Sequence, residues 1–347
     1  MSSIKMVQYG VGNMSKYSIS YAMKKGIDVV AGFDICESKI GNEFESLSGK
    51  HKVQDAREFE NFIKSNKVDI VVVTTRSLIK ELEDVLTICA ENGVNAITIC
   101  EEAFYPKNSS PRIYNKINEL AKKNKCKITG TGYQDVFWGN LIMAISGATI
   151  EINKIVGSSS YDVRDYGEAL AKAHGVGLTK EEFDNQIAVV DRISDKEREV
   201  LIENGEFLPS YMWNTNGWLA ERLNLEVISQ KQECVPIFAD DDMKCEELNI
   251  DISKGLVRGM SAVVTTETKQ GITIISECVG KVYTTDEYDK NIWKVEGEPS
   301  TEIVVSRPCT VELTCATLIN RIFDLLQYDG FGYIETCKMP SNLFKQK

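Results

Sequence analysis

The sequence predicts an α/β protein, in which a doubly wound parallel sheet covered by helices is followed by a second α+β domain with a mixed or antiparallel sheet. Unbroken apolar strands alternate with amphipathic helices through residues 1–147, which is typical of a parallel sheet buried on both faces. From residue 148 to about 310 the strands instead alternate apolar and polar side chains, as half-buried strands do. The length of 347 residues accommodates two domains.

The first strand, turn and helix, within residues 4–36, have the form of a dinucleotide-binding turn, which is typical of a Rossmann-type sheet. Gly10 and Gly12 lie between strand and helix, where backbone N–H groups approach a pyrophosphate only if no Cβ intrudes. Asn13 and Met14 begin the helix, whose N-terminal dipole favours an anion. We therefore expect these four residues to bind the phosphates of a dinucleotide.

The second strand ends on Asp34, twenty-two residues after Gly12, at the position of the acid that holds an adenosine ribose. A carboxylate there accepts hydrogen bonds from two hydroxyl groups and repels a 2′-phosphate, so NAD is favoured as cofactor, with NADP as the alternative. The third small position of the pattern is Ser15, which still permits close packing of the helix on the strand. The alternative to a dinucleotide site is an ordinary turn that binds nothing.

The alternation of strands and helices continues to residue 147. We expect helices at 53–66, 79–93 and 111–125, and strands with their following loops at 67–77, 94–102 and 126–135. Ligands of such sheets bind beyond the carboxyl ends of the strands. Thr74, Thr75 and Arg76 lie at one of these ends, and we expect them to line the nicotinamide half of the cofactor.

The second half is expected to form the substrate and oligomerisation domain, residues 148–310. Its expected strands and helices are at 150–163, 256–268, 271–280 and 300–308, and at 180–190 and 211–224, respectively. The final helix, at about 310–330, is expected to pack back on the first domain.

Composition argues against several classes of partner. The net charge of −11 and the lack of a basic stripe argue against nucleic acid and against an anionic membrane surface. No signal-like or membrane-spanning apolar run occurs, so we expect a cytoplasmic protein. The ten dispersed cysteines contain no C-x-x-C pair and are interpreted as buried thiols, and with only two histidines we expect no metal site.

Two adjacent acids, Glu101 and Glu102, follow the strand at 94–100, where a nicotinamide would lie. We predict that Glu102 is the catalytic residue, because a carboxylate can attract an amine, take its proton and stabilise the iminium left by hydride loss. Neighbouring residues on a turn point in different directions, so Glu101 is assigned to the nicotinamide ribose or a helix N-terminus. The alternative is that both acids are solvated groups at a helix start.

A second candidate segment, residues 130–139, begins with two closely spaced glycines, which Tyr133, Gln134 and Asp135 follow. The aromatic residues supply apolar walls and a cation–π face, and the polar tip suits a small substrate that carries an amine. Phe137 and Trp138 are equally well explained as core residues of the next helix.

His174 lies shortly after the expected domain change and is the third candidate. It is interpreted as a substrate hydrogen-bond donor, as a proton relay, or as the C-terminal residue of a helix before Gly175. Arg164 and Asp165 are candidates for binding a substrate carboxylate, with surface ion pairing as the alternative.

Several segments together resemble those of the 2,4-diaminopentanoate dehydrogenases and native amine dehydrogenases, whose N-terminal domain is like that of dihydrodipicolinate reductase. The resemblance spans nearly the whole chain, and its segments are YGVGNMS, VVAGFD, VVVTTRS, ITICEEAFYP, ITGTGYQDVFWGNL, HGVGLTKEEFD and GFGYIETCKMP. The glycine turn is generic, whereas the EEAFYP and GTGYQDVFWG segments are more specific.

The resemblance implies NAD(P)-linked oxidative deamination of 2,4-diaminopentanoate to 2-amino-4-oxopentanoate with release of ammonia, reversible as reductive amination. By matched motif, Glu102 is similar to the essential carboxylate of the family, and Gly10, Gly12 and Asp34 to its dinucleotide contacts. Asp135 is then expected to recognise the second ammonium of a diamino acid. The family fold also implies a homodimer that forms through the apolar faces of the second-domain sheet.

Other functions remain open. A simple-amine dehydrogenase would use the same chemistry. Sugar and alcohol dehydrogenases of this architecture carry a lysine where this chain has Glu102, which weakens that reading. Reduction of a cyclic imine, as in dihydrodipicolinate reductases, is disfavoured because the chain has no His-His pair. A non-catalytic NAD-binding sensor would bind the nucleotide without turnover.

Overall fold

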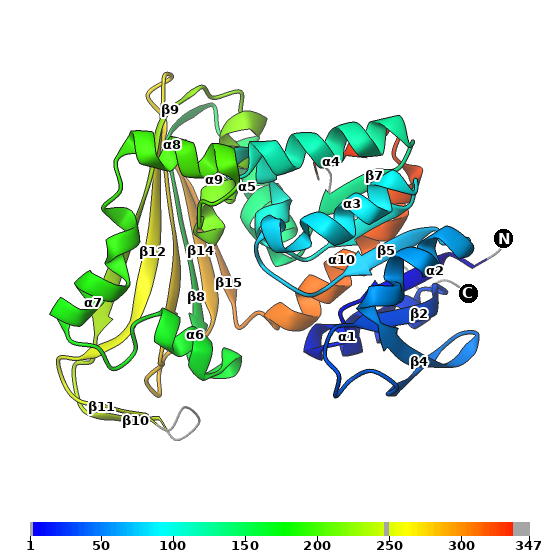
Figure 1. Cartoon of the computed structure of the whole chain (residues 1–347). Coiled ribbons are helices and arrows are strands. Elements are labelled where there is room, and N and C mark those ends of the chain that lie inside the picture. The colour runs from blue at the N-terminus through cyan, green and yellow to red at the C-terminus, as the bar shows by residue number, and fades with distance from the viewer. Residues whose placement is uncertain (1–2, 246–249, 336–347) are drawn as a thin grey trace. The chain divides into compact units, whose positions relative to one another are not determined.

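The computed structural model describes residues 3–245 and 250–335 (Figure 1). These residues divide into two compact units. The first unit contains the described residues up to 136, then 202–208, and those from 309 onward. The second unit contains residues 137–201 and the described part of 209–308.

The first unit is built on a sheet whose strand order, in the described chain, is β16-β7-β6-β5-β1-β2-β4-β3. The pairings are parallel except for the antiparallel pair of β3 with β4. The strands are β1 (Lys5–Tyr9), β2 (Asp28–Asp34), β3 (Glu43–Ser46), β4 (Gly49–Asp55), β5 (Ile70–Val73), β6 (Asn95–Thr98), β7 (Lys127–Gly130) and β16 (Gly332–Tyr333). The expected Rossmann-type parallel sheet is therefore confirmed.

Helices cover both faces of this sheet because its central strands are apolar on both sides. Ile70 and Val72 of β5 belong to one core cluster, and Val71 and Val73 belong to the other. The first cluster includes apolar residues of α1 (Asn13–Lys24) and α10 (Thr310–Gln327). The second includes residues of α2 (Phe59–Ser65), α3 (Glu83–Glu91) and α4 (Pro111–Lys123). The candidate site therefore rests on a sheet that is held from both sides.

Two parts of the first unit differ from the expected elements. The helix expected at 53–66 begins only at Phe59, because residues up to Asp55 form the second strand of the β3–β4 hairpin. The hairpin strands alternate exposed and partly buried side chains, a signal too short to separate from a helix start. The strand β16 also extends the sheet beyond β7 and was not expected.

The second unit is built on a mostly antiparallel sheet, of order β15-β14-β8-β13-β12-β9 in the described residues, in which only β8 and β13 pair in parallel. Its strands are β8 (Glu151–Asp162), β9 (Val227–Phe238), β12 (Val257–Thr268), β13 (Thr273–Lys281), β14 (Lys290–Glu298) and β15 (Thr301–Ser306), beside the hairpin of β10 (Met243–Cys245) and β11 (Ile250–Ile252). The helices are α5 (Leu141–Ser146), α6 (Glu168–Ala173), α7 (Lys180–Gln186), α8 (Asp195–Asn204, whose last residues belong to the first unit) and α9 (Tyr211–Arg222). This sheet confirms the expected α+β second domain.

One face of the second sheet is covered by α9, which is buried along most of its length. Asn216 of this helix donates from its amide nitrogen to the carbonyl oxygens of Val264 and Ile274, at 3.2 and 3.3 Å. The hydroxyl of Ser276 donates in turn to the Asn216 side-chain oxygen at 2.6 Å. Buried polar side chains thus fix the helix on the sheet through hydrogen bonds.

The second unit begins at Phe137, eleven residues before the expected start at 148. The indole nitrogen of Trp138 donates to the Asn291 side chain of β14 at 3.3 Å, and α5 packs on the same strand. Trp138 is therefore a packing residue, in agreement with the core interpretation of the sequence.

Candidate functional site

The glycine turn after β1 has the backbone that a dinucleotide turn requires. Gly10 has φ +90°, and its N–H donates to the Phe33 carbonyl oxygen at 2.7 Å. A Cβ at this position would lie 2.4 Å from Cγ2 of Thr75 and 2.9 Å from the Thr74 carbonyl oxygen. The fold itself therefore requires glycine at position 10.

Gly12 differs, because the protein leaves space beside it. The nearest atom to a Cβ at this position would be Nζ of Lys39, 3.7 Å away. Helix α1 starts at the next residue, Asn13, with no acid in its first turn and no side chain of the described residues capping it. An open cradle beside an uncapped helix N-terminus fits a pyrophosphate, which would be held by backbone N–H groups at Asn13 and Met14.

Asp34 ends β2 and is 7% exposed. One of its oxygens accepts hydrogen bonds from the Val11 N–H at 2.8 Å and from the Lys39 ammonium at 3.2 Å. The other oxygen accepts from the Cys36 N–H at 2.9 Å. Burial raises the pKa of Asp34, but these three donors outweigh it and hold the pKa below its ordinary value. The acid is thus ionised and fixed beside the glycine turn.

Thr74 supports the same turn from the end of β5. Its hydroxyl donates to the Gly10 carbonyl oxygen at 2.9 Å and accepts from the Gln8 side-chain nitrogen at 2.9 Å. Thr75 and Arg76 follow and are exposed to solvent. Their contact with a nicotinamide stays a prediction, whereas the Thr74 hydroxyl is already used to hold the backbone.

The Glu102 side chain points into the protein interior, and the residue is only 4% exposed. One carboxylate oxygen accepts from the Ile79 N–H at 2.7 Å. The other accepts from the hydroxyls of Ser109 and Ser110, at 2.7 and 2.6 Å. Both oxygens thus join two loops of the first unit, and these contacts do not support the predicted role of Glu102 on a substrate.

Glu101, one residue earlier, is partly exposed, and its carboxylate is hydrogen-bonded to the Ser77 side chain. Burial raises the pKa of Glu101, and the Ser77 hydrogen bond lowers it only in part. The two neighbours differ because they start a single 3₁₀ turn, in which successive side chains point about a third of a turn apart. A carboxylate with a raised pKa at the end of a central strand is suited to proton transfer.

Asp135 has 0% exposure and a different partner from the one predicted. The Arg321 guanidinium of α10 binds it in bidentate fashion, at 2.6 Å to each oxygen. The Thr131 hydroxyl donates to the same carboxylate at 2.8 Å. These contacts do not support a contact of Asp135 with a second ammonium, and that role stays a prediction. Asp135 is the first residue of a π-helix, Asp135–Asn140, and its ion pair with Arg321 lies within the first unit.

Tyr133 and Gln134, also predicted to bind substrate, are nearly buried. The Gln134 side-chain nitrogen donates to the Thr131 carbonyl oxygen at 3.1 Å. The same side chain lies 2.8 Å from the position that a Cβ would occupy at Gly132, which has φ +141°. Gly132 therefore makes room for the Gln134 side chain of its own segment, and substrate contact by Tyr133 and Gln134 stays a prediction.

His174 belongs to the second unit, at the C-terminal end of α6. Its Nδ1 donates to the Leu170 carbonyl oxygen at 2.8 Å, which leaves Nε2 to accept from the Tyr161 hydroxyl at 2.7 Å. Burial lowers the pKa of His174, so the ring is neutral near pH 7. The helix-end position agrees with one of the three interpretations, and a role toward substrate stays a prediction.

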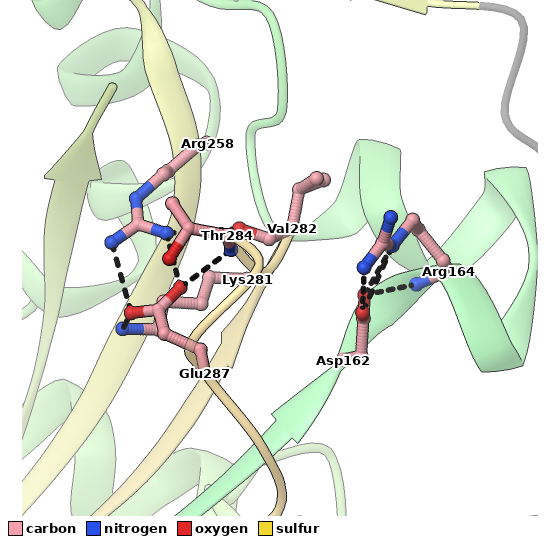
Figure 2. A network of polar contacts seen from close by, with 7 residues as sticks. All are labelled: Asp162, Arg164, Arg258, Lys281, Val282, Thr284 and Glu287. Carbon is pink, nitrogen blue, oxygen red and sulfur yellow. Dashed lines mark hydrogen bonds and ion pairs between the residues drawn. The ribbon is translucent and has the colours of Figure 1, made fainter. Parts of the chain in front are cut away.

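The second unit also contains a polar cluster around Glu287 (Figure 2). Its carboxylate accepts from Arg258 at 2.6 and 3.2 Å, from Lys281 at 2.5 Å and from the Thr284 N–H at 2.9 Å. Burial raises the pKa of Glu287, but the hydrogen bonds from Arg258 and Lys281 bring it down to about 2. These contacts attach the loop between β13 and β14 to Arg258 of β12 and Lys281 of β13.

The ion pair drawn beside it in Figure 2 joins Arg164 to Asp162. The Arg164 guanidinium donates to both Asp162 oxygens, with distances between 2.5 and 3.0 Å. Arg164 therefore has the intramolecular partner that the sequence left as the alternative to a substrate carboxylate.

The first unit brings the dinucleotide candidates together at one edge of the sheet. Gly10, Asp34, Thr74 and Glu101 follow β1, β2, β5 and β6, which are adjacent parallel strands. Sequence reasoning missed three residues at or near this edge: Ser77, Lys39 and Arg321. The signal for Lys39 was a cation five residues after the ribose acid. The signal for Arg321 was an arginine on the apolar side of the final helix.

Over residues 3–245 and 250–335, no three histidine, cysteine, aspartate or glutamate side chains gather as a metal site would need. Within the same ranges, every helix is too short or too polar to cross a membrane.

Comparisons with known proteins give a consistent family. The chain is 31% identical to an amine dehydrogenase from Mycobacterium smegmatis, with a TM-score of 0.81 over 96% of this chain and 95% of that one. It is also 24% identical, over 192 residues, to 2,4-diaminopentanoate dehydrogenase from Acetoanaerobium sticklandii, a match that spans 54% of each chain. No protein-family model matches the sequence.

A more distant solved structure shares the fold alone. Dihydrodipicolinate reductase from Paenisporosarcina sp. TG-14 is 13% identical, with a TM-score of 0.51 over 96% of this chain and 97% of that one. The likeness to the mycobacterial enzyme is much higher and extends over both units. The chain therefore belongs to the amine dehydrogenase family of oxidoreductases.

Proposed function

We propose that this protein is an NAD(P)-dependent dehydrogenase that removes an amino group oxidatively from a diamino acid, with 2,4-diaminopentanoate as substrate and 2-amino-4-oxopentanoate as product. The observation that carries the chemistry is the position of the Glu101 carboxylate, partly exposed in the loop that follows β6 (Asn95–Thr98) and hydrogen-bonded to Ser77, where burial raises its pKa. The choice of substrate rests on the 24% identity with 2,4-diaminopentanoate dehydrogenase. Asp135 does not contribute to it, because Arg321 occupies that carboxylate.

The first unit is assigned to the dinucleotide. Gly10 and Gly12 let the backbone approach the pyrophosphate, Asn13 and Met14 present the α1 N-terminus, and Asp34 accepts from the ribose hydroxyls. The second unit is assigned to substrate and subunit contacts. When bound, the cofactor supplies a nicotinamide ring that accepts a hydride.

Glu101 acts as general base in this proposal. It takes one proton from the substrate ammonium, so that the neutral amine can release hydride from its carbon and become an iminium ion. After releasing this proton to solvent, Glu101 takes a proton from the water that attacks the iminium and returns it to the nitrogen that leaves. The net reaction consumes the substrate ammonium, oxidised cofactor and water, and yields ketone, ammonium, reduced cofactor and one proton.

The test is a comparison of substrate classes by the absorbance of NADH or NADPH. We expect the highest kcat/KM with 2,4-diaminopentanoate, a lower value with simple amines, and no turnover with polyols. Preference for a simple amine would refute the diamino-acid assignment. Turnover of polyols alone would refute deamination, and binding of NAD without any turnover would indicate a sensor.

We also propose that the protein is a homodimer formed through the face of the second sheet opposite α9. Side chains on the α9 face are buried, whereas those on the opposite face are only partly buried and include several apolar ones. These are Val156, Val263, Ile275, Val279 and Ile292. An apolar sheet face of this kind fits a second copy of itself.

Sedimentation of the Val263→Lys variant tests this interface, because a buried lysine would break it. We expect a dimer for the unmodified chain and a monomer for the variant. Glu199→Lys, on the exposed side of α8, is the matched control and should stay dimeric. A monomeric unmodified chain, or a dimeric Val263→Lys variant, would contradict the proposed interface.

A further inference from the structure

Lys39 lies between Asp34, the proposed ribose-binding acid, and Gly12 of the proposed phosphate-binding turn. Its ammonium is 3.2 Å from Oδ2 of Asp34. It is also 3.7 Å from the position that a Cβ of Gly12 would occupy, in the space that the glycine leaves open. The Lys39 N–H donates to the Cys36 carbonyl oxygen at 2.9 Å, so a short turn after β2 fixes where the side chain begins. A cation is therefore held beside both the ribose acid and the phosphate turn.

This position changes the charge that a nucleotide meets. Asp34 alone would repel a 2′-phosphate, which is the usual reason that an acid here favours NAD. With Lys39 on its oxygen, the pair has no net charge. The Lys39 side chain is 39% exposed, so it can move from the carboxylate to a ligand at low cost.

Asp34 does not depend on Lys39 for its place in the turn. The Val11 and Cys36 N–H groups each donate to one of its oxygens and remain when the lysine leaves. The carboxylate can thus stay ionised and oriented while the ammonium binds elsewhere. A 2′-phosphate, with up to two negative charges, is a stronger partner for an ammonium than one carboxylate oxygen.

We propose that Lys39 makes the site accept NADP as well as NAD, by transferring its ammonium from Asp34 to the 2′-phosphate of the ligand. With NAD the lysine stays bound to Asp34, and the carboxylate oxygens of Asp34 also accept hydrogen bonds from the ribose hydroxyls. This inference rests on the proposed dinucleotide site and adds the residue that sets its choice between the two nucleotides.

Direct binding without any amine tests the inference. NADH and NADPH are titrated against the unmodified chain, Lys39→Gln, Lys39→Arg and the surface control Lys50→Gln, with nucleotide fluorescence as readout. We expect both nucleotides to bind the unmodified chain. Lys39→Gln should weaken NADPH roughly tenfold to a hundredfold, as loss of one charge-assisted contact does, and NADH less than threefold. Lys39→Arg and Lys50→Gln should retain NADPH.

Three results would overturn the inference: binding of NADH alone by the unmodified chain, equal weakening of both nucleotides by Lys39→Gln, or unchanged NADPH affinity in that variant. Binding of neither nucleotide would refute the dinucleotide site itself, and with it this role of Lys39. Because no amine is present, failure of the deamination proposal leaves these outcomes unaffected. Thermal melting of Lys39→Gln, expected to match the unmodified chain, shows that a lost affinity is not a lost fold.

Discussion

Glu101 and Glu102 are adjacent acids with different surroundings. Glu102 binds three protein donors and is buried, whereas Glu101 is partly exposed and has a raised pKa. The two acids could be placed at the end of this strand from the sequence, because they directly follow an apolar run. Which acid faces outward depends on the loops that contain Ile79, Ser109 and Ser110, and a local pattern does not contain that information.

Exchange of each acid for its amide separates the two roles. We expect Glu101→Gln to lower kcat by about 10² to 10⁴, the usual contribution of a general base, with nucleotide affinity and melting temperature unchanged. Glu102→Gln should instead lower stability by about 1–3 kcal/mol, because buried donors lose their acceptor. Turnover and thermal melting of the two variants provide the measurement. A larger loss of kcat in Glu102→Gln at equal stability would return the catalytic role to Glu102.

The raised pKa of Glu101 also gives a pH dependence. A general base works only when it is deprotonated, so kcat should rise with pH through a pKa above the ordinary glutamate value. We expect this acid limb in the unmodified chain and not in the residual activity of Glu101→Gln. An identical limb in both would assign it to another group.

Asp135 shows which contacts a local pattern leaves out at the residue scale. Its role on a second ammonium follows from the family resemblance and stays a prediction, whereas its partner Arg321 lies 186 positions further along the chain. Asp135→Asn removes the bidentate partner of a buried guanidinium and leaves it only the ion pair with Asp324 at 3.6 Å, so we expect a loss of about 3 kcal/mol in stability. Values of kcat/KM for 2,4-diaminopentanoate and for a simple amine should fall by the same factor. A selective loss on the diamino acid in a fully stable variant would restore the recognition role.

At the scale of elements, the glycine turn, the parallel strands and the final helix were predictable, because each has a strong local pattern. The β3–β4 hairpin and β16 were not, since their pairing depends on strands distant in the chain. The two glycines of the turn also differ in a way that the motif does not show. A Cβ at Gly10 would clash with neighbouring atoms of the protein, whereas a Cβ at Gly12 would not.

Alanine at each glycine tests this difference. Gly10→Ala should destabilise the chain by about 1–2 kcal/mol or more, because it combines a positive φ with contacts to the Thr74 backbone. Gly12→Ala should melt like the unmodified chain and bind NADH at least tenfold more weakly, because its Cβ enters the phosphate space. Thermal melting and nucleotide titration distinguish the two. Unchanged affinity in a stable Gly12→Ala variant would argue against phosphate binding at this turn.

The C-terminal end of α6 carries a second pH dependence. Burial lowers the pKa of His174 in the folded chain, so the unfolded chain binds more protons as pH falls through about 6.5. Stability should therefore decrease below this pH, and His174→Asn should flatten the decrease. Melting temperatures between pH 7.5 and 5.5 give the comparison, and His51→Asn is the matched control. A His174→Asn variant with the original pH slope would contradict the buried neutral ring.

At the scale of the whole molecule, the family could be recognised from short segments spread along the chain, and the 31% identity over 96% of it confirms that recognition. The part of the closing GFGYIETCKMP segment after Glu335 lies outside the described residues. The unit boundary at Phe137 falls within the expected first domain, and the contact of Trp138 with Asn291 of β14 joins residues 153 positions apart, which a local pattern does not contain.

Membership of the amine dehydrogenase family leads to one chemical expectation at this scale, namely that hydride transfer and release of ammonium occur together. The stoichiometry of ammonium to reduced cofactor during oxidation of 2,4-diaminopentanoate measures this most directly. We expect one ammonium for each NADH or NADPH formed, and the reverse dependence on ammonium when the keto product is reduced. Formation of reduced cofactor without ammonium would contradict oxidative deamination.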